Sequence, residues 1–94
     1  MRRYRIALSA TAEAAVHDLH PDLKRSIRHA LEILARAPER GIELERELQG
    51  LRRYRVRRFR IVYEVDSSAR ILRVLAIGHR TSVYEELADS RRRR

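Results

Sequence analysis

The chain has 94 residues, a formal net charge of +9 at pH 7 and no cysteine. This length predicts one small domain, and the absence of cysteine excludes disulfide and thiolate chemistry and agrees with a cytoplasmic location. No apolar run approaches the roughly 20 residues of a membrane-spanning helix, and no signal-peptide core follows the charged N-terminus, so we expect no membrane partner.

The positive charge is concentrated in the C-terminal half. Residues 1–50 contain nine basic and eight acidic residues, whereas residues 51–94 contain thirteen arginines and five acidic residues. Every basic residue except Lys24 is an arginine, and arginine binds phosphate through two parallel hydrogen bonds. A GC-rich genome would also enrich arginine, so the uneven distribution is the stronger signal. It predicts a polyanion or an acidic protein as the partner.

The N-terminal half is predicted to form a strand and two helices. Apolar and polar residues alternate over residues 3–8, which indicates a half-buried strand. Ser9 can cap a helix that extends to about residue 19. After a proline, apolar residues recur at helical spacing over residues 23–34 and predict a second helix, which Pro38 ends. The short break between the helices favours a helical hairpin.

The C-terminal half is predicted to be mostly strands. A charged stretch at residues 42–50 has room for one helical turn. The pattern then changes to a period of two over residues 51–57 and 60–65, which indicates two strands, and residues 70–77 form a third, more apolar strand. Residues 83–87 are compatible with a short helix.

The order β-α-α-β-β-β predicts an α+β fold. We expect residues 1–90 to form a single domain and residues 91–94 to form a basic, disordered tail. The last three strands should form an antiparallel meander that the N-terminal strand joins, with the helix hairpin on one face. The other face is then partly open. The alternation places the arginines on that open face, if the two strands match across the turn at residues 57–60: Arg55, Arg57 and Arg60 oppose Tyr54, Val56 and Ile61.

Four segments form a recognisable series. They are Tyr4-Arg5-Ile6-Ala7-Leu8-Ser9, Leu48-Gln49-Gly50-Leu51-Arg52-Arg53-Tyr54-Arg55-Val56, Phe59-Arg60-Ile61-Val62-Tyr63-Glu64-Val65, and Val74-Leu75-Ala76-Ile77-Gly78-His79-Arg80 with Val83-Tyr84. In this order they resemble the RelE/ParE toxin superfamily of type II toxin–antitoxin systems, over residues 4–86. The ending is similar to the RelE branch, whose members are ribosome-dependent messenger-RNA endonucleases. ParE-type gyrase poisons share the scaffold but usually lack that ending.

The resemblance implies an endoribonuclease that uses neither a metal nor another cofactor. Such a reaction needs a base near the 2′-hydroxyl, a cation at the phosphorane and an acid at the leaving 5′-oxygen. By motif position, Arg60 matches the arginine on the scissile phosphate, Arg80 matches the second catalytic arginine, and Tyr84 matches a tyrosine proposed as base or acid. The expected RNA-binding residues are Arg53, Arg55, Arg57 and Arg58.

One departure from the superfamily bears on proton transfer. Arg55 and Arg57 stand where the best-known member has lysines, and arginine cannot act as a base. The remaining candidates are Tyr84, His79 and Glu64. We expect Tyr84 to transfer the proton and His79 to orient the reacting groups, while Glu64 could equally be the structural partner of an arginine.

Several of these features also have a structural explanation. The six arginines of residues 52–60 could be a solvated basic face. Tyr54 and Tyr63 fall on the apolar side of their strands and are expected in the core. Three histidines have helical spacing without a cysteine or acidic cluster that would complete a metal site, so we expect them at the surface: His17, His20 and His29.

Three functions are therefore open. The leading hypothesis is a toxin that cleaves messenger RNA in the ribosomal A site. The second is a non-enzymatic inhibitor of DNA gyrase, and the third is an inactive member that acts only as a corepressor with its antitoxin. The expected partners are the ribosome, messenger RNA and an antitoxin whose acidic segment wraps the toxin, with a possible toxin–antitoxin hetero-oligomer.

Overall fold

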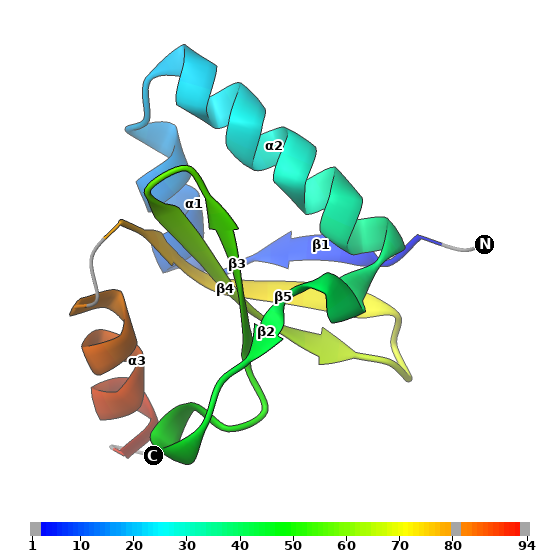
Figure 1. Cartoon of the computed structure of the whole chain (residues 1–94), viewed down its shortest axis with the longest axis vertical. Coiled ribbons are helices and arrows are strands. Elements are labelled where there is room, and N and C mark those ends of the chain that lie inside the picture. The colour runs from blue at the N-terminus through cyan, green and yellow to red at the C-terminus, as the bar shows by residue number, and fades with distance from the viewer. Residues whose placement is uncertain (1–2, 80–81, 93–94) are drawn as a thin grey trace.

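The computed structural model describes residues 3–79 and 82–92 (Figure 1). The α+β order predicted from the sequence is confirmed, with one added strand and one added 3-10 turn; the helical turn expected within residues 42–50 is present as the second 3-10 turn. In chain order the elements are β1 (Arg5–Leu8), α1 (Ala10–His17), α2 (Pro21–Arg36), a 3-10 turn (Pro38–Arg40), β2 (Ile42–Glu43), a second 3-10 turn (Arg46–Leu48), β3 (Arg52–Val56), β4 (Phe59–Asp66), β5 (Ile71–Gly78) and α3 (Ser82–Arg92).

The strands form one sheet in the order β1-β5-β4-β3-β2. The pairs β2–β3, β3–β4 and β4–β5 are antiparallel, and β1 lies parallel to β5 at one edge. This is the predicted meander joined by the N-terminal strand. The added strand β2 forms the other edge; two residues are too few to produce a readable alternation in the sequence.

Helices α1 and α2 cover one face of the sheet (Figure 1). The Oγ atom of Ser9 accepts a hydrogen bond from the Ala12 backbone N–H at 3.0 Å and caps α1, as predicted. Helix α2 buries Ile27, Ala30 and Leu34, whose spacing places them on one side of the helix. The three histidines of this region are exposed, as expected.

Tyr63 is the largest fully buried side chain on this side of β4. Its hydroxyl donates a hydrogen bond to the Pro38 carbonyl oxygen at 2.6 Å and accepts one from the Gly41 N–H at 2.9 Å. Burial raises the pKa of the Tyr63 hydroxyl above its ordinary value. The prediction that Tyr63 belongs to the core is thus confirmed, and its hydroxyl joins the central strand to the segment after α2.

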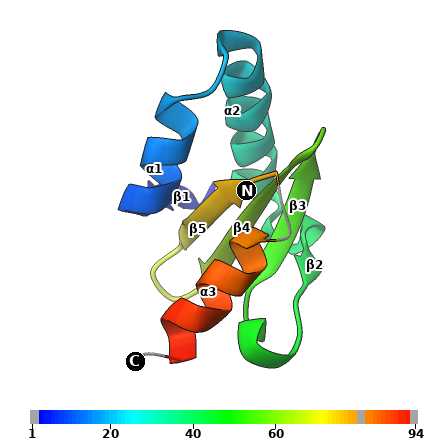
Figure 2. The same cartoon turned by 90° about the vertical axis from the view of Figure 1, so that its left-hand side faces the viewer.

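The second face of the sheet is covered by α3, which differs from the prediction. Figure 2 shows α3 on the opposite side of the strands from α1 and α2. Its apolar residues pack on Leu48, Leu51, Val62 and Ala76 and form a second apolar cluster; these helix residues are Val83, Tyr84, Leu87 and Ala88. The predicted helix was short because its packing partners lie far away in the sequence.

Helix α3 also changes the predicted boundary between domain and tail. It extends to Arg92, so the first two residues of the predicted disordered tail are helical. The Nη1 atom of Arg91 donates hydrogen bonds to the carbonyl oxygens of Glu47 and Gln49 at 3.1 and 3.0 Å, which fixes the end of the helix to the loop before β3. Among the helices described, none is long and apolar enough to cross a membrane.

Candidate functional site

Three predicted site arginines lie on one face of the sheet. Arg55 pairs with Arg60 across β3 and β4, and Arg53 pairs with Val62. Val62 packs in the cluster beneath α3, and facing residues of paired strands share a side. Arg53, Arg55 and Arg60 therefore lie on the α3 side, opposite Tyr54 and Ile61, as predicted. Within residues 3–79 and 82–92 none of the three forms a salt bridge.

Arg60 is held at the end of this face. It is half-buried rather than fully exposed, and its Nη1 atom lies 3.5 Å from the His79 carbonyl oxygen, which can accept its hydrogen bond. The guanidinium has five N–H donors, so most of them remain for an anion. Arg60 is thus both positioned by the backbone and able to bind phosphate.

Arg57 and Arg58 lie at the tip of the β3–β4 hairpin. Val56 pairs with Phe59, so these two arginines form the turn, and both are exposed. Arg57 adopts a left-handed backbone with φ of 56°, and its carbonyl oxygen accepts a hydrogen bond from Arg55 Nε at 3.0 Å. The predicted position of Arg57 on the strand face is therefore wrong, because the strand ends at Val56.

Arg52 belongs to the same arginine run but has a structural role. Its Nη1 atom donates to the carbonyl oxygens of Gly41 and Glu39 at 2.7 and 3.3 Å, and its Nη2 atom donates to Glu43 Oε1 at 3.1 Å. These bonds connect β3 to the segment that follows α2. A run of arginines in the sequence thus separates into one structural residue and several surface cations.

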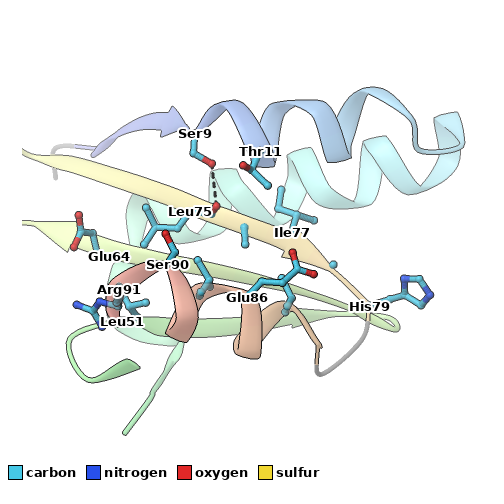
Figure 3. Close-up of a pocket in the computed structure, with 14 residues that line it drawn as sticks. Ser9, Thr11, Leu51, Glu64, Leu75, Ile77, His79, Glu86, Ser90 and Arg91 are labelled. Carbon is cyan, nitrogen blue, oxygen red and sulfur yellow. Dashed lines mark hydrogen bonds between the residues drawn. The ribbon is translucent and has the colours of Figure 1, made fainter. Parts of the chain in front are cut away.

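His79 lies at the end of β5, beside Arg60. Its side chain is exposed, and its ring stacks at a tilt on Phe59, with ring centroids 5.2 Å apart and an interplanar angle of 38°. Figure 3 shows the His79 ring pointing away from the sheet. Arg80, the second predicted catalytic arginine, lies outside the described residues.

Tyr84 has a different environment from the one that catalysis would require. It is part of the second apolar cluster, and its hydroxyl oxygen is buried without a hydrogen-bond partner among the described residues. A buried, unpaired hydroxyl costs about 1–3 kcal/mol. Because this oxygen is buried, it can contact a bound phosphate only if α3 or the side chain moves.

Glu64 lies too far along β4 to act on the same phosphate as Arg60. The two residues are four positions apart on one strand, which corresponds to roughly 13 Å between their Cα atoms. Glu64 instead lines a cavity of about 580 Å³ between β5, the start of α1 and α3 (Figure 3). Glu86 points into this cavity from α3 (Figure 3), and apolar residues of β5 line it as well.

The site contains no recognisable set of metal ligands within the part of the chain that the structure describes. No group of three or more histidine, aspartate or glutamate side chains is arranged there to hold an ion. The charges at the site come from guanidinium groups, which bind anions and do not coordinate cations. This donor set suits a phosphate ligand.

Residues 4–84 match the family described as the ParE toxin of the type II toxin–antitoxin system parDE. The chain belongs to this family of toxins. It is therefore a member of the RelE/ParE superfamily, as the sequence motifs indicated. No curated protein sequence matches the chain.

Solved structures have the same fold as this toxin. The RelBE2 toxin–antitoxin complex from Mycobacterium tuberculosis contains a chain with 29% identity and a TM-score of 0.79, covering 85% of the toxin and 94% of that chain. A chain of the intact Escherichia coli RelBE complex has 16% identity and a TM-score of 0.72, and the match covers 82% of the toxin and 96% of that chain. A chain of the YoeB–YefM complex from Staphylococcus aureus has 18% identity and a TM-score of 0.68, and the match covers 83% of the toxin and 98% of that chain.

Sequence reasoning missed how α3 changes the toxin's site. The open face that the arginines were expected to occupy is partly covered by α3, and Tyr84 is turned into the cluster beneath it. The spacing of Val83, Tyr84, Leu87 and Ala88 was the available signal, because these positions form one apolar side of a helix.

Proposed function

We propose that the toxin is an endoribonuclease that cuts messenger RNA on the ribosome, in the cytoplasm. The observation that carries the proposal is the arrangement of Arg53, Arg55 and Arg60 on one face, with no ion pair to any residue in the described ranges. Gathered guanidinium groups repel one another unless an anion lies between them, and the RNA backbone supplies such an anion.

The proposed reaction is attack of a ribose 2′-oxygen on the adjacent phosphorus. A base removes the 2′-hydroxyl proton, the new P–O bond forms, the bond to the 5′-oxygen breaks, and that oxygen takes up a proton. Arg60 holds the phosphate and stabilises the negative charge that develops on its oxygens. Arg53 and Arg55 bind neighbouring phosphates and set the register of the RNA strand.

His79 is the best-placed group for the proton transfer. Its ring is exposed, whereas the Tyr84 hydroxyl is buried. Its backbone carbonyl accepts the hydrogen bond from Arg60, so a phosphate bound to Arg60 is brought close to this residue. Histidine accepts and donates protons near neutral pH. We therefore assign the base role to His79 in preference to Tyr84.

Primer extension on a translated message tests this function. Toxin added to a purified translation system should produce breaks within codons, and the same RNA without ribosomes should remain intact. The Arg60→Ala variant serves as the inactive control. Intact message at toxin concentrations that arrest translation would contradict the proposal.

Inhibition of DNA gyrase is the second candidate function. The matching family is the ParE toxin family, and the buried Tyr84 hydroxyl removes one of the groups expected in a ribonuclease site. In this case the arginine face binds an acidic surface or DNA instead of messenger RNA. Stabilised gyrase–DNA cleavage complexes together with intact message would select this function.

We also propose that an antitoxin with an acidic, amphipathic segment neutralises the toxin. The similar chains come from toxin–antitoxin complexes, and the +9 charge of this toxin favours an acidic partner. Co-expression with an acidic neighbouring gene product should give a stable complex whose association slows as salt increases. Failure of every such product to bind would refute this partner.

A further inference from the structure

A second concave site lies at the opposite end of β4 from Arg60. It is a cavity of about 390 Å³ between the start of β1, the end of α2 and the β4–β5 turn, and Figure 1 shows these three segments on the side of the sheet away from the β3–β4 turn. We call it the arginine cavity; its polar and aromatic lining comprises Tyr4, Arg36, Glu39, Arg52, Ser67 and Arg70.

The arginine cavity carries a net positive charge. Three guanidinium groups line it, and Glu39 is its one acidic lining residue. Arg36 and Arg70 are exposed and form no salt bridge with any residue in the described ranges. Like charges around a concave surface are unfavourable unless an anion is bound, so this composition points to an anionic ligand.

Two of the three cations are held in fixed positions. The Arg70 guanidinium carbon lies 5.6 Å from the centroid of the Tyr4 ring, a cation–π arrangement that orients the planar group. Arg52 makes three hydrogen bonds to Gly41, Glu39 and Glu43, which leaves two of its five N–H groups. These two cations are thus ordered before any ligand binds, which lowers the entropy cost of binding.

We infer that the arginine cavity binds the sugar–phosphate backbone of a structured RNA, away from the cleavage site. Val65, which lines it, lies five residues from Arg60 along β4, roughly 16 Å, and packs on the α1–α2 side of the sheet. A short RNA strand on the Arg60 face does not follow this path. A large folded RNA that surrounds the toxin contacts both faces, and this inference rests on the ribosomal target proposed above.

Salt dependence of binding tests the inference directly. The probes are the purified small ribosomal subunit and a ten-nucleotide single-stranded RNA, each titrated with toxin between about 50 and 200 mM salt. The logarithm of the binding constant falls linearly with the logarithm of the salt concentration, and each lost phosphate contact makes this slope shallower by about one. The double variant Arg36→Ala, Arg70→Ala should make the slope for the subunit shallower by about two. The slope for the ten-nucleotide RNA should remain unchanged.

The control is Arg28→Ala, which removes the same charge from the exposed side of the same helix and should leave both slopes unchanged. Arg36→Lys should retain most of the slope, and all variants should unfold at the wild-type temperature. An unchanged slope for the subunit overturns the inference, as does an equal loss with both RNAs. So does an unchanged slope combined with weakened binding of an acidic antitoxin peptide, which would make the cavity a carboxylate site.

The same experiment separates this inference from the proposed nuclease. If no message is cut but the subunit slope falls by about two, the nuclease proposal fails and the RNA contact stands. If message is cut and the slope is unchanged, the reverse holds.

Discussion

Gly41 lies directly against the phenol of Tyr63. The Gly41 N–H donates a hydrogen bond to the Tyr63 hydroxyl at 2.9 Å, and a Cβ atom at position 41 would lie 2.8 Å from the Tyr63 ring atoms Cε1 and Cζ. Tyr63 is fully buried and its hydroxyl is held by two hydrogen bonds, so its ring cannot swing out into solvent to make room. The glycine is required here for the close approach and not for an unusual backbone angle.

Gly41→Ala should therefore destabilise the toxin by about 1–3 kcal/mol, since overpacking forces a shift in a filled core. Denaturant unfolding followed by circular dichroism measures the change. The control is Gly78→Ala, where an added Cβ would contact Val83 at 3.4 Å and should cost less. Equal stability of the two variants would show that the segment around residue 41 adjusts freely.

Arg60→Ala should lower the single-turnover cleavage rate by about 10²–10³-fold, because it removes the main donor to the developing phosphorane charge. Arg60→Lys should retain part of the activity, since lysine keeps the charge but loses the two-point contact. The fold should persist, as judged by an unchanged circular dichroism spectrum. A folded Arg60→Ala variant with full toxicity would remove Arg60 from the site.

His79→Gln should lower the single-turnover rate by at least about 10²-fold, the usual contribution of a general base. Tyr84→Phe should change it only a few-fold, because the Tyr84 hydroxyl is buried. The sequence had favoured the opposite assignment, with Tyr84 transferring the proton and His79 orienting the reacting groups. The assay uses programmed ribosomes at saturating concentration, so that docking does not limit the rate. A dead Tyr84→Phe variant would show that α3 opens before cleavage.

Tyr84→Phe should also stabilise the free toxin. Removing a buried hydroxyl that has no partner among the described residues should gain about 1 kcal/mol, or about 4–8 °C in Tm for a domain of this size. Tyr63→Phe is the matched control and should destabilise, because it deletes a hydroxyl with two hydrogen bonds. Differential scanning calorimetry measures the Tm of both variants. A lower Tm for Tyr84→Phe would show that the Tyr84 hydroxyl does form a hydrogen bond in the folded toxin.

Asp66 should make stability depend on pH in the acidic range. The Ala69 N–H, together with Arg73 and the Ser68 hydroxyl, holds the pKa of the Asp66 carboxyl below its ordinary value. Because the pKa is lower in the folded state, Asp66 contributes fully to stability above the unfolded-state pKa, near 3.9. This contribution is lost as the pH falls through the folded-state pKa. In the Asp66→Asn variant, Tm should fall less steeply with pH below about pH 4 than in the wild type. The same steepness in both proteins would refute this.

Local pattern was enough to predict most of the backbone. The period-two alternation of β4 and the helical spacing of Ile27, Ala30 and Leu34 correspond to the faces that are buried, because side-chain periodicity follows from backbone geometry alone. The same reasoning placed Tyr63 in the core and Arg55 and Arg60 on the other side. The series of motifs identified the superfamily, which the family match confirms.

The sequence by itself thus determined the α+β order, the apolar faces and the superfamily of this toxin. The tertiary structure decided which arginines are available, because Arg52 takes backbone oxygens that come from the segment before β2. It also turned Tyr84 inward and brought Tyr4, Arg36 and Arg70 to one cavity. These arrangements depend on contacts between residues of different elements, such as Arg52 with Gly41 and Tyr4 with Arg70. A local period carries no information about which other element will pack on a given face.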